Sequence, residues 1–448
     1  MAPGNRSVDF LVIGGGMAGL TAAAAFARTG GTVALIERAE DVGGSAQFAG
    51  FAWTAPSDEV MSEVNPDGDP ALRARLVAEF PAGVEWLRGL GVSCGPAVTV
   101  LRYGRGHQLD TAAYISACAR LIRDSGAPIE RGAETQALVR DGRRVAGARV
   151  RLAGGAVVEF RARHTLLATG GFQGDPRLRA THIHPQAADI QLRSNPTSDG
   201  GGFRLGLAVG AAFGKPQAGF YGHLIPAGVR LDPSLFVELS LYYSEHALLF
   251  DLEGRRFVDE TVGDHLTTMA LVSRPQARGL LVADAVTYRD WISGSYVEGI
   301  PGIDKFDRCV RRGARAATVD TIEDFDLMPP EWGYPGEVVR RGIEEFNRQM
   351  AGDATTEPGR RYDRRPLDTP PYYVIDAAPA VTFTLGGLLI DEHARVLGED
   401  GTVIDGLLCA GADAGGLYRG AYAGGIAPAL VFGLAAARTA AQQSSPMG

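Results

Sequence analysis

The chain has 448 residues, which is longer than one hydrophobic core usually serves, so its length predicts two domains. A formal net charge of -8 argues against a nucleic-acid or anionic-membrane surface, because either partner requires a basic face. The 60 glycines exceed the average share of about 7%, which indicates that glycine serves local structural purposes.

The start of the chain, MAPGNRSVDF, shows no charged and apolar leader, and the apolar stretch GGIAPALVFGLAAA is too short to span a bilayer. These features predict a cytoplasmic protein without a membrane span. Four scattered cysteines form no Cys-x-x-Cys pair, and His182 and His184 have no carboxylate or cysteine beside them at useful spacing. We therefore expect no metal site.

The first elements form one βαβ unit. The pattern predicts a buried strand over Val8–Ile13, an alanine-rich helix over Gly16–Arg28 and a second strand over Thr32–Glu37. A glycine turn, GGGMAG, joins the first strand to the helix.

The glycines of this turn have the spacing of a dinucleotide-binding fingerprint. Gly14 permits the tight turn, Gly16 allows a pyrophosphate to approach the helix N-terminus, and Gly19 lets the helix pack closely on the strand. Glu37 ends the second strand, where its carboxylate accepts hydrogen bonds from a ribose diol. Together these residues predict a dinucleotide site.

Two later segments, His164–Phe172 and Gly406–Gly416, are short apolar strands that end in paired glycines and suit central parallel strands. Between them, SNPTSDGGGFRLGLAVGAAFG is typical of a loop that opens a helix. From about Lys215 to Pro366 aromatic and charged residues increase, and helix and strand signals mix. This change predicts a second domain inserted into the first.

The fingerprint, LLATGGF and GLLCAGADAGG together resemble the FAD-dependent oxidoreductases of the fumarate reductase and succinate dehydrogenase flavoprotein type, which include the 3-ketosteroid dehydrogenases. The resemblance runs through nearly the whole chain. It implies an α/β fold with an α+β cap: a Rossmann-like FAD domain of the glutathione-reductase type, residues 1–214 and 367–448, carrying a capping domain, residues 215–366, with the reaction at their junction.

The resemblance also implies the FAD-binding residues, which are Gly14, Gly16, Ala18, Gly19, Glu37, Arg38, Gly44, Ser45, Ala168, Thr169, Gly170, Asp413 and Ala427. Asp413 stands where the family usually has glutamate. Members with covalent flavin carry a histidine in the segment that matches GGSAQFAG, and this chain has none there. Non-covalent FAD is therefore expected.

Fumarate reduction in this family uses an arginine acid shortly after an RF-x-x-E motif. Here the segment is RFVDETVGDHL, and the aligned acid position is Gly263, which cannot donate a proton. The arginine that feeds this acid aligns near Tyr243, and a substrate-binding histidine aligns with Thr382. Of the dicarboxylate-binding residues only His223 remains, so the resemblance disfavours fumarate reduction and succinate oxidation.

Tyrosines replace these arginines, as in the ketosteroid dehydrogenase branch, where tyrosines and a backbone amide promote loss of an α-proton from a ketone. The resemblance implies that Tyr422, which precedes AGGIAPALVFG, polarises the carbonyl. The Gly425 amide is a second candidate, because bare glycine amides approach an oxygen closely. A tyrosine that acts as a base needs a lowered pKa, which a cation such as Arg419 provides. The adjacent Tyr242 and Tyr243 are further candidates, of which a strand would direct only one to the site.

The sequence therefore predicts an FAD-dependent dehydrogenase, or desaturase, that forms a C=C bond α,β to the carbonyl of a small or cyclic ketone. Hydride would pass to flavin N5 and then to an external acceptor, namely a quinone, an electron-transfer protein or O2. Two alternatives stay open: a flavin-dependent ene-reductase that acts on an enone or another activated alkene, and a non-redox flavoprotein such as an isomerase.

Overall fold

The computed structural model describes residues 6–214, 217–294, 302–352 and 357–442. The chain divides into two compact units. Unit 1 comprises Met1–Ile183, Ser194–Phe220 and Phe383–Gly448, and unit 2 comprises His184–Arg193 and Tyr221–Thr382. The main segment of unit 2, Tyr221–Thr382, begins and ends later than the predicted capping domain, residues 215–366. Unit 2 also includes the short segment His184–Arg193, which was predicted to belong to the FAD domain. Lys215, the predicted boundary, lies outside the described residues.

Unit 1 contains an eight-stranded sheet whose main order is β18-β19-β9-β1-β2-β6. Its strands are β1 (Arg6–Ile13), β2 (Val33–Ile36), β6 (Ile129–Glu130), β7 (Glu134–Asp141), β8 (Arg144–Arg151), β9 (Val157–Leu167), β18 (Arg395–Leu397) and β19 (Val403–Cys409). β1 pairs in parallel with both β2 and β9, and β9 pairs in parallel with β19. These pairings confirm the predicted βαβ unit and the two later parallel strands.

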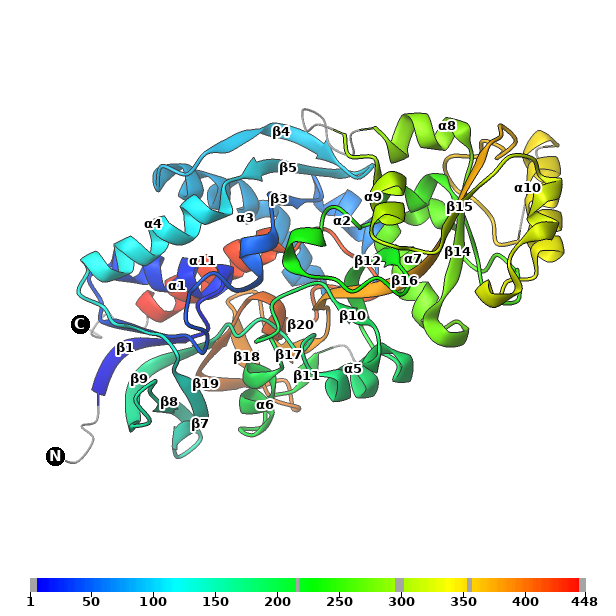
Figure 1. Cartoon of the computed structure of the whole chain (residues 1–448). Helices are drawn as coiled ribbons and strands as arrows, with labels where there is room; N and C mark the ends of the chain where they lie inside the picture. The colour runs from blue at the N-terminus through cyan, green and yellow to red at the C-terminus, as the bar shows by residue number, and fades with distance from the viewer. Residues whose placement is uncertain (1–5, 215–216, 295–301, 353–356, 443–448) are drawn as a thin grey trace. The chain divides into compact units, whose positions relative to one another are not determined.

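The helices of unit 1 are α1 (Met17–Ala27), α2 (Asp58–Val64), α3 (Pro70–Gly89), α4 (Thr111–Asp124), α5 (Pro176–His182), α6 (Gly201–Leu207) and α11 (Ile426–Gln442). α1 and α11 lie against the main sheet, with α3 and α4 packed beyond them (Figure 1). The close approach of α11 to α1 requires Gly433, since a Cβ there would lie 2.8 Å from the Ala18 carbonyl oxygen.

Two small sheets complete unit 1. One consists of β3 (Phe51–Thr54), β5 (Gly104–Leu109) and β4 (Cys94–Val100), and the other of β11 (Phe213–Gly214), β17 (Gly387–Leu389) and β20 (Ala414–Gly415). Trp53 of β3 packs edge-on against Tyr422, with ring centres 5.3 Å apart. The first small sheet thus supports one of the predicted catalytic residues.

Unit 2 is built on a sheet in which β16 (Tyr372–Thr384) pairs with β10 (Gln191–Leu192), β12 (Phe220–Pro226), β14 (Gly279–Ala283) and β15 (Ala316–Val319), and β14 pairs with β13 (Leu248–Phe250). Its helices are α7 (Asp264–Val272), α8 (Ala285–Thr287), α9 (Lys305–Arg311) and α10 (Gly336–Ala351). Successive residues of β14 and β16 alternate between two apolar clusters, as the period of a strand requires. The sheet therefore has a core on each face.

The prediction that Tyr242 and Tyr243 lie in a strand is wrong. They begin a 3-10 helix, Tyr242–His246, although they still point in different directions. Tyr243 is buried in one of the two apolar cores, whereas Tyr242 is half-buried.

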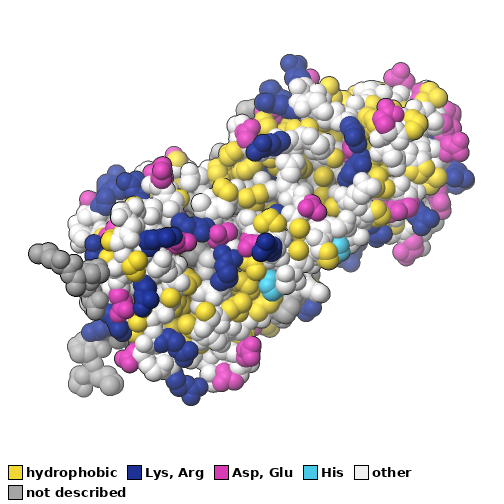
Figure 2. Space-filling model, turned by 60° about the horizontal axis from the view of Figure 1, so that its bottom comes forward, with side chains coloured by type: hydrophobic (Ala, Val, Ile, Leu, Met, Phe, Trp, Pro, Cys, Tyr) yellow, Lys and Arg dark blue, Asp and Glu magenta, His cyan; other side chains and the backbone are white. Residues whose placement is uncertain are grey.

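On the face that Figure 2 shows, Lys and Arg side chains are interspersed with Asp and Glu side chains. In the described part of the chain, no helix is both long and apolar enough to cross a bilayer.

Candidate functional site

The turn between β1 and α1 leaves room for a ligand at one of its three fingerprint glycines. A Cβ at Gly14 would lie 2.1 Å from the Ala168 oxygen, and one at Gly19 would lie 1.8 Å from the Gly14 oxygen. A Cβ at Gly16 would meet nothing within 4 Å. Packing therefore requires glycine at positions 14 and 19, whereas a Cβ at Gly16 would contact no other atom.

Gly16 is also the N-cap of α1, and as a glycine it has no side chain that could cap the first amide groups of the helix. The first amide groups of an uncapped helix are available to an anion, and the helix dipole favours negative charge there. The pyrophosphate of a dinucleotide fits this space and these donors. Ala18, in the first turn of α1, is buried and packs beside Gly411.

Glu37 is held firmly at the end of β2. One of its oxygens accepts a hydrogen bond from the Gly15 amide at 2.6 Å, and the other accepts one from the Ala39 amide at 2.7 Å. A carboxylate oxygen has a second lone pair, so Glu37 can still accept a hydrogen bond from a ribose hydroxyl.

Arg38 forms an ion pair of 2.9 Å with Asp199 and donates to the Thr197 oxygen. The hydrogen bond to Asp199 is the main reason that the pKa of Arg38 is raised. Arg38 thus ties the end of β2 to the loop before α6.

Gly44 and Ser45 open a 3-10 helix, Gly44–Phe48, beside the glycine turn. A Cβ at Gly44, which has a φ of +51°, would lie 3.3 Å from the Gly16 Cα. The Ser45 hydroxyl is hydrogen-bonded to the Ser194 hydroxyl at 2.7 Å. Gly44 thus borders the space beside Gly16, as its predicted role requires.

The turn after β9, which contains Ala168, Thr169 and Gly170, is organised by Asp413. The fully buried carboxylate of Asp413 accepts hydrogen bonds from the Thr169 amide, from the Thr169 hydroxyl at 3.0 Å and from the Gly171 amide at 2.9 Å. Burial raises the pKa of Asp413, and these donors oppose that effect. Asp413 therefore acts on the turn, which lies at the carboxyl ends of the central strands together with Gly14.

The segment before α11 is fixed by two phenols. Tyr103 donates to the Tyr422 carbonyl at 2.5 Å, and Tyr418 donates to the carbonyls of Ala423 at 2.7 Å and Gly424 at 2.9 Å. Three consecutive carbonyl groups are thus bound by side chains. Burial raises the pKa of Tyr418 well above 10, so Tyr418 is a hydrogen-bond donor and not a base.

Two amide groups of the same segment, unlike its carbonyl groups, have no hydrogen-bond partner among the described residues. Neither Gly424 nor Gly425 donates its N–H to an acceptor among the residues that the structure describes. Gly424 has a φ of +97°, and a Cβ there would lie 1.9 Å from the Trp53 oxygen, so packing requires glycine at this position. Ala427 follows in the first turn of α11 and is fully buried.

The predicted role of Arg419 does not agree with its position. Its side chain is exposed, whereas Tyr418 and Tyr422 are buried, and Arg419 is not among the groups that shift the pKa of Tyr418. The cation that was expected to activate a tyrosine must be sought elsewhere in the chain.

In unit 2, His223 of β12 pairs with Asp264, the first residue of α7. Asp264 also accepts from the Leu224 amide at 3.3 Å and the Ser244 hydroxyl at 3.4 Å. Burial lowers the pKa of His223, although Asp264 opposes this effect. His223 is therefore a neutral side chain oriented by a carboxylate.

Of the adjacent tyrosines, only Tyr242 contacts polar groups of this region. Arg193 Nη2 donates to its hydroxyl at 3.0 Å, and its ring packs edge-on against His223, with ring centres 4.8 Å apart. Burial in the apolar core raises the pKa of Tyr243 well above 10. This burial excludes Tyr243 as a base and leaves Tyr242 as the candidate in unit 2.

Sequence reasoning did not identify Arg193, Asp264 or Lys305 as functional residues. Arg193 lies after β10, and Lys305 begins α9. The one available signal was Asp264, which directly follows Gly263 in RFVDETVGDHL. Among the described residues, no group of three His, Cys, Asp or Glu side chains is placed to hold a metal ion.

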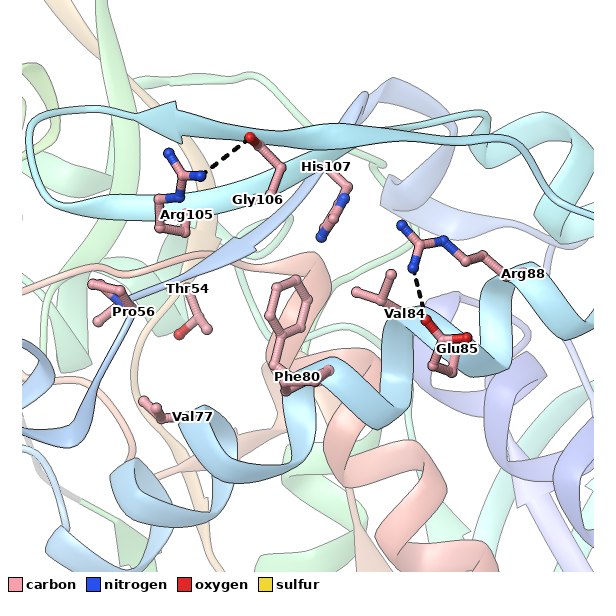
Figure 3. Close-up of a pocket in the computed structure, with 13 residues that line it drawn as sticks. Thr54, Pro56, Val77, Phe80, Val84, Glu85, Arg88, Arg105, Gly106 and His107 are labelled. Carbon is pink, nitrogen blue, oxygen red and sulfur yellow. Dashed lines mark hydrogen bonds and ion pairs between the residues drawn. The ribbon is translucent and has the colours of Figure 1, made fainter.

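Unit 1 also has a pocket of about 300 Å³ between α3 and the sheet formed by β3, β5 and β4. Phe80 and Val84 point from α3 towards His107 of β5, and Arg88 pairs with Glu85 at its edge (Figure 3). None of the predicted site residues lines this pocket, so we do not assign it to the reaction.

The FAD binding domain family matches residues 9–427 of this chain. The chain belongs to this family, and FAD is its cofactor. It is an FAD-dependent oxidoreductase of the superfamily that includes the fumarate reductases and the 3-ketosteroid dehydrogenases.

Individual relatives are more distant. The chain is 26% identical to a fumarate reductase (cytochrome) of Shewanella frigidimarina over 473 residues, covering 98% of this chain and 78% of that protein. It is 27% identical to the 4-oxocyclohex-2-ene-1-carboxylate 5-dehydrogenase of Sinomonas cyclohexanicum over 306 residues, covering 62% and 51% of the two chains.

Among solved structures, a 3-ketosteroid Δ1-dehydrogenase of Sterolibacterium denitrificans superposes with a TM-score of 0.79. The match covers 98% of this chain and 100% of that one at 16% identity, which shows a shared fold. This fold is the α/β architecture that the sequence predicted.

Proposed function

We propose that the protein is a dehydrogenase that forms a carbon–carbon double bond α,β to the carbonyl of a small or cyclic ketone. The observation that carries this proposal is the segment from Tyr422 to Gly425, whose carbonyls are bound by two phenols and whose glycine amides have no described acceptor. A fixed phenol and a bare amide are the donors that stabilise a developing enolate oxygen. The Sinomonas relative, named for a monocyclic ketone, supports this substrate class.

In this reaction the Tyr422 hydroxyl and the Gly425 amide donate to the ketone oxygen, which lowers the cost of removing the adjacent proton. The proton passes to a base in its deprotonated form, and Tyr242, whose oxygen accepts a hydrogen bond from Arg193 and is not enclosed in an apolar core, is the candidate in unit 2 for a phenolate in this role. The β-carbon loses hydride, so the substrate loses two hydrogens and two electrons in total. Non-covalent FAD, when bound, supplies the acceptor for the hydride.

Other residues of unit 1 hold the cofactor without contacting the ketone. Gly16 and the first amides of α1 bind the pyrophosphate, and Glu37 binds the ribose. Gly44 and Ser45 border the space beside Gly16. Asp413 keeps the Thr169–Gly171 turn in place. An external acceptor then removes the electrons.

The alternative is a reductase that saturates an activated alkene, which the likeness to a fumarate reductase over 98% of the chain favours. A neutral His223 and a glycine at position 263 argue against fumarate itself, because neither supplies a proton or a positive charge. The direction of the reaction is thus the main point to test.

The test is anaerobic absorbance of the holoenzyme at the oxidised-flavin band during addition of cyclic ketones, keto acids and ketosteroids, with succinate as the control. Bleaching by a ketone, with the matching enone as product, supports the dehydrogenase. If no ketone bleaches the flavin and the dithionite-reduced enzyme is reoxidised by an enone, the protein is an ene-reductase. If neither reaction occurs while a ketone is isomerised, the flavin has no redox role.

A further inference from the structure

Unit 2 buries two cations beside Tyr242. The side chains of Arg193 and Lys305 belong to residues that are only 8% and 7% exposed. Arg193 Nη2 donates to the Tyr242 hydroxyl at 3.0 Å, and Lys305 Nζ lies 5.0 Å from the centre of the Tyr242 ring. We call these three residues the Arg193–Lys305 cluster.

Neither cation is paired with a carboxylate among the described residues. The partners of Arg193 are the Phe236 carbonyl and the hydroxyls of Ser240, Thr382 and Tyr242. Lys305 donates to the Val237 carbonyl. Burial of two positive charges with neutral partners alone is unfavourable, and it is retained where a ligand supplies the missing negative charge.

The surrounding charged groups do not neutralise the cluster. Glu238 is the carboxylate whose charge acts on Lys305, but it forms an ion pair of 3.3 Å with Arg312. The carboxylate of Asp264 is hydrogen-bonded to His223, whose pKa burial lowers. Cys309, whose pKa burial raises to about 12, is a neutral thiol.

The donor count of Arg193 suits a carboxylate. A guanidinium has five N–H groups, and the described contacts use one on Nε, one on Nη1 and one on Nη2. One N–H on each terminal nitrogen therefore remains, which is the number that a carboxylate takes in a bidentate pair. The backbone amide of Arg193 donates to the Val381 oxygen at 2.7 Å, which fixes the residue to the edge of β16.

We propose that the Arg193–Lys305 cluster binds a carboxylate group of the substrate, so that the substrate is a ketone that also carries a carboxylate. Identification of this group as part of the substrate rests on the proposed ketone dehydrogenase, whereas the anion site itself does not. Arg193 forms the bidentate pair, and Lys305 adds a second positive charge. The site thereby selects keto acids over neutral ketones of the same ring size.

The first experiment measures binding without turnover. Isothermal titration calorimetry of the holoenzyme with cyclohexanecarboxylate, which has no ketone, is compared with titration of its methyl ester. We expect the acid to bind at least about tenfold more tightly than the ester, as loss of a charge-assisted pair implies. Equal affinities for acid and ester would overturn the proposal.

Variants assign the effect to the cluster. We expect Arg193→Gln and Lys305→Met each to weaken binding of the acid about 10- to 100-fold and to leave binding of the ester unchanged. Arg311→Gln removes an exposed positive charge from the same helix as Lys305 and serves as the matched control. Lys305→Met keeps the test valid if Arg193→Gln fails to fold, and an effect of the control as large as that of Lys305→Met would contradict the assignment.

The two proposals fail in different ways. Reduction of the flavin by cyclohexanone and by 4-oxocyclohexanecarboxylate with equal kcat/KM would refute the carboxylate site and leave the dehydrogenase intact. Binding of cyclohexanecarboxylate that depends on Arg193, without bleaching by any ketone, would support the anion site and refute the dehydrogenase.

Discussion

Lys305→Met tests whether the buried ammonium is held at a cost to stability. Burial is the main reason that the pKa of Lys305 falls from 10.5 to about 8. A lysine with a lowered folded pKa opposes folding at neutral pH, and this penalty decreases as pH rises from about 8 towards 10.5, because the unfolded chain then binds more protons. At about 1.4 kcal/mol per pH unit, the difference between 10.5 and about 8 corresponds to about 3 kcal/mol at pH 7.

Part of this gain is offset in the variant. The ammonium donates to the Val237 carbonyl and lies near the Tyr242 ring, and loss of these contacts costs about 1 kcal/mol. We therefore expect Lys305→Met to unfold with a free energy about 2 kcal/mol higher than that of the parent protein at pH 7. At pH 9.5 most of the penalty has gone from the parent protein, so this advantage should fall by about 2 kcal/mol.

The assay is urea unfolding of the holoenzyme, followed by circular dichroism at pH 7 and pH 9.5 with FAD in fixed excess. Arg311→Gln is the control and should change little at either pH, because its partner and its side chain are exposed. A variant that is less stable than the parent at pH 7, or an advantage independent of pH, would refute the reasoning. Saturating cyclohexanecarboxylate should stabilise the parent protein more than the variant.

Four further substitutions, one of them with a matched control, separate cofactor binding, loop structure and catalysis. Gly16→Ala should change the free energy of unfolding of the apoprotein by less than about 1 kcal/mol relative to the parent protein, and it should weaken FAD binding, measured by flavin fluorescence. Gly19→Ala should prevent stable folding, because a Cβ at this position clashes with the Gly14 backbone. Tyr418→Phe should lower the free energy of unfolding by about 1–3 kcal/mol and speed amide exchange before α11, since one buried hydroxyl serves two carbonyls; unchanged exchange would contradict that role. Tyr422→Phe should lower kcat about 100- to 1,000-fold with an unchanged substrate Kd, and Tyr373→Phe, whose hydroxyl has no hydrogen bond among the described residues, is its control.

The turn of unit 1 that we propose to bind the nucleotide was predictable because its signals are local. Gly14, Gly16 and Gly19 lie within six residues, and their spacing expresses one turn between one strand and one helix. The structure shows that the three glycines have different causes: packing against backbone for two of them, and space for a ligand at Gly16. Sequence pattern alone does not separate these causes.

The proposed substrate-binding residues of unit 2 were not predictable in the same way. Arg193, Tyr242 and Lys305 come from three separate stretches, and no local pattern reveals that two cations share one phenol. The sequence predicted that a catalytic tyrosine needs a neighbouring cation, and proximity along the chain favoured Arg419, which is exposed. The cation that contacts the Tyr242 hydroxyl is Arg193, which lies 49 positions away along the chain.

The protonation state of His223 distinguishes a ketone site from a dicarboxylate site, and it can be measured directly. Burial lowers the pKa of His223 below its usual 6.5, so the ring should already be neutral at pH 7. The proton is then on Nδ1, because that nitrogen faces the Asp264 carboxylate and must donate to it. We expect NMR of the holoenzyme with ¹⁵N-labelled histidine, with the signal assigned by His223→Gln, to show the Nδ1–H tautomer from pH 6.5 to pH 8. Asp264→Asn should remove this preference for one tautomer. A doubly protonated ring at pH 7 would instead add a third positive charge to those of Arg193 and Lys305, and a dicarboxylate would then fit the site better than a ketone with a single carboxylate.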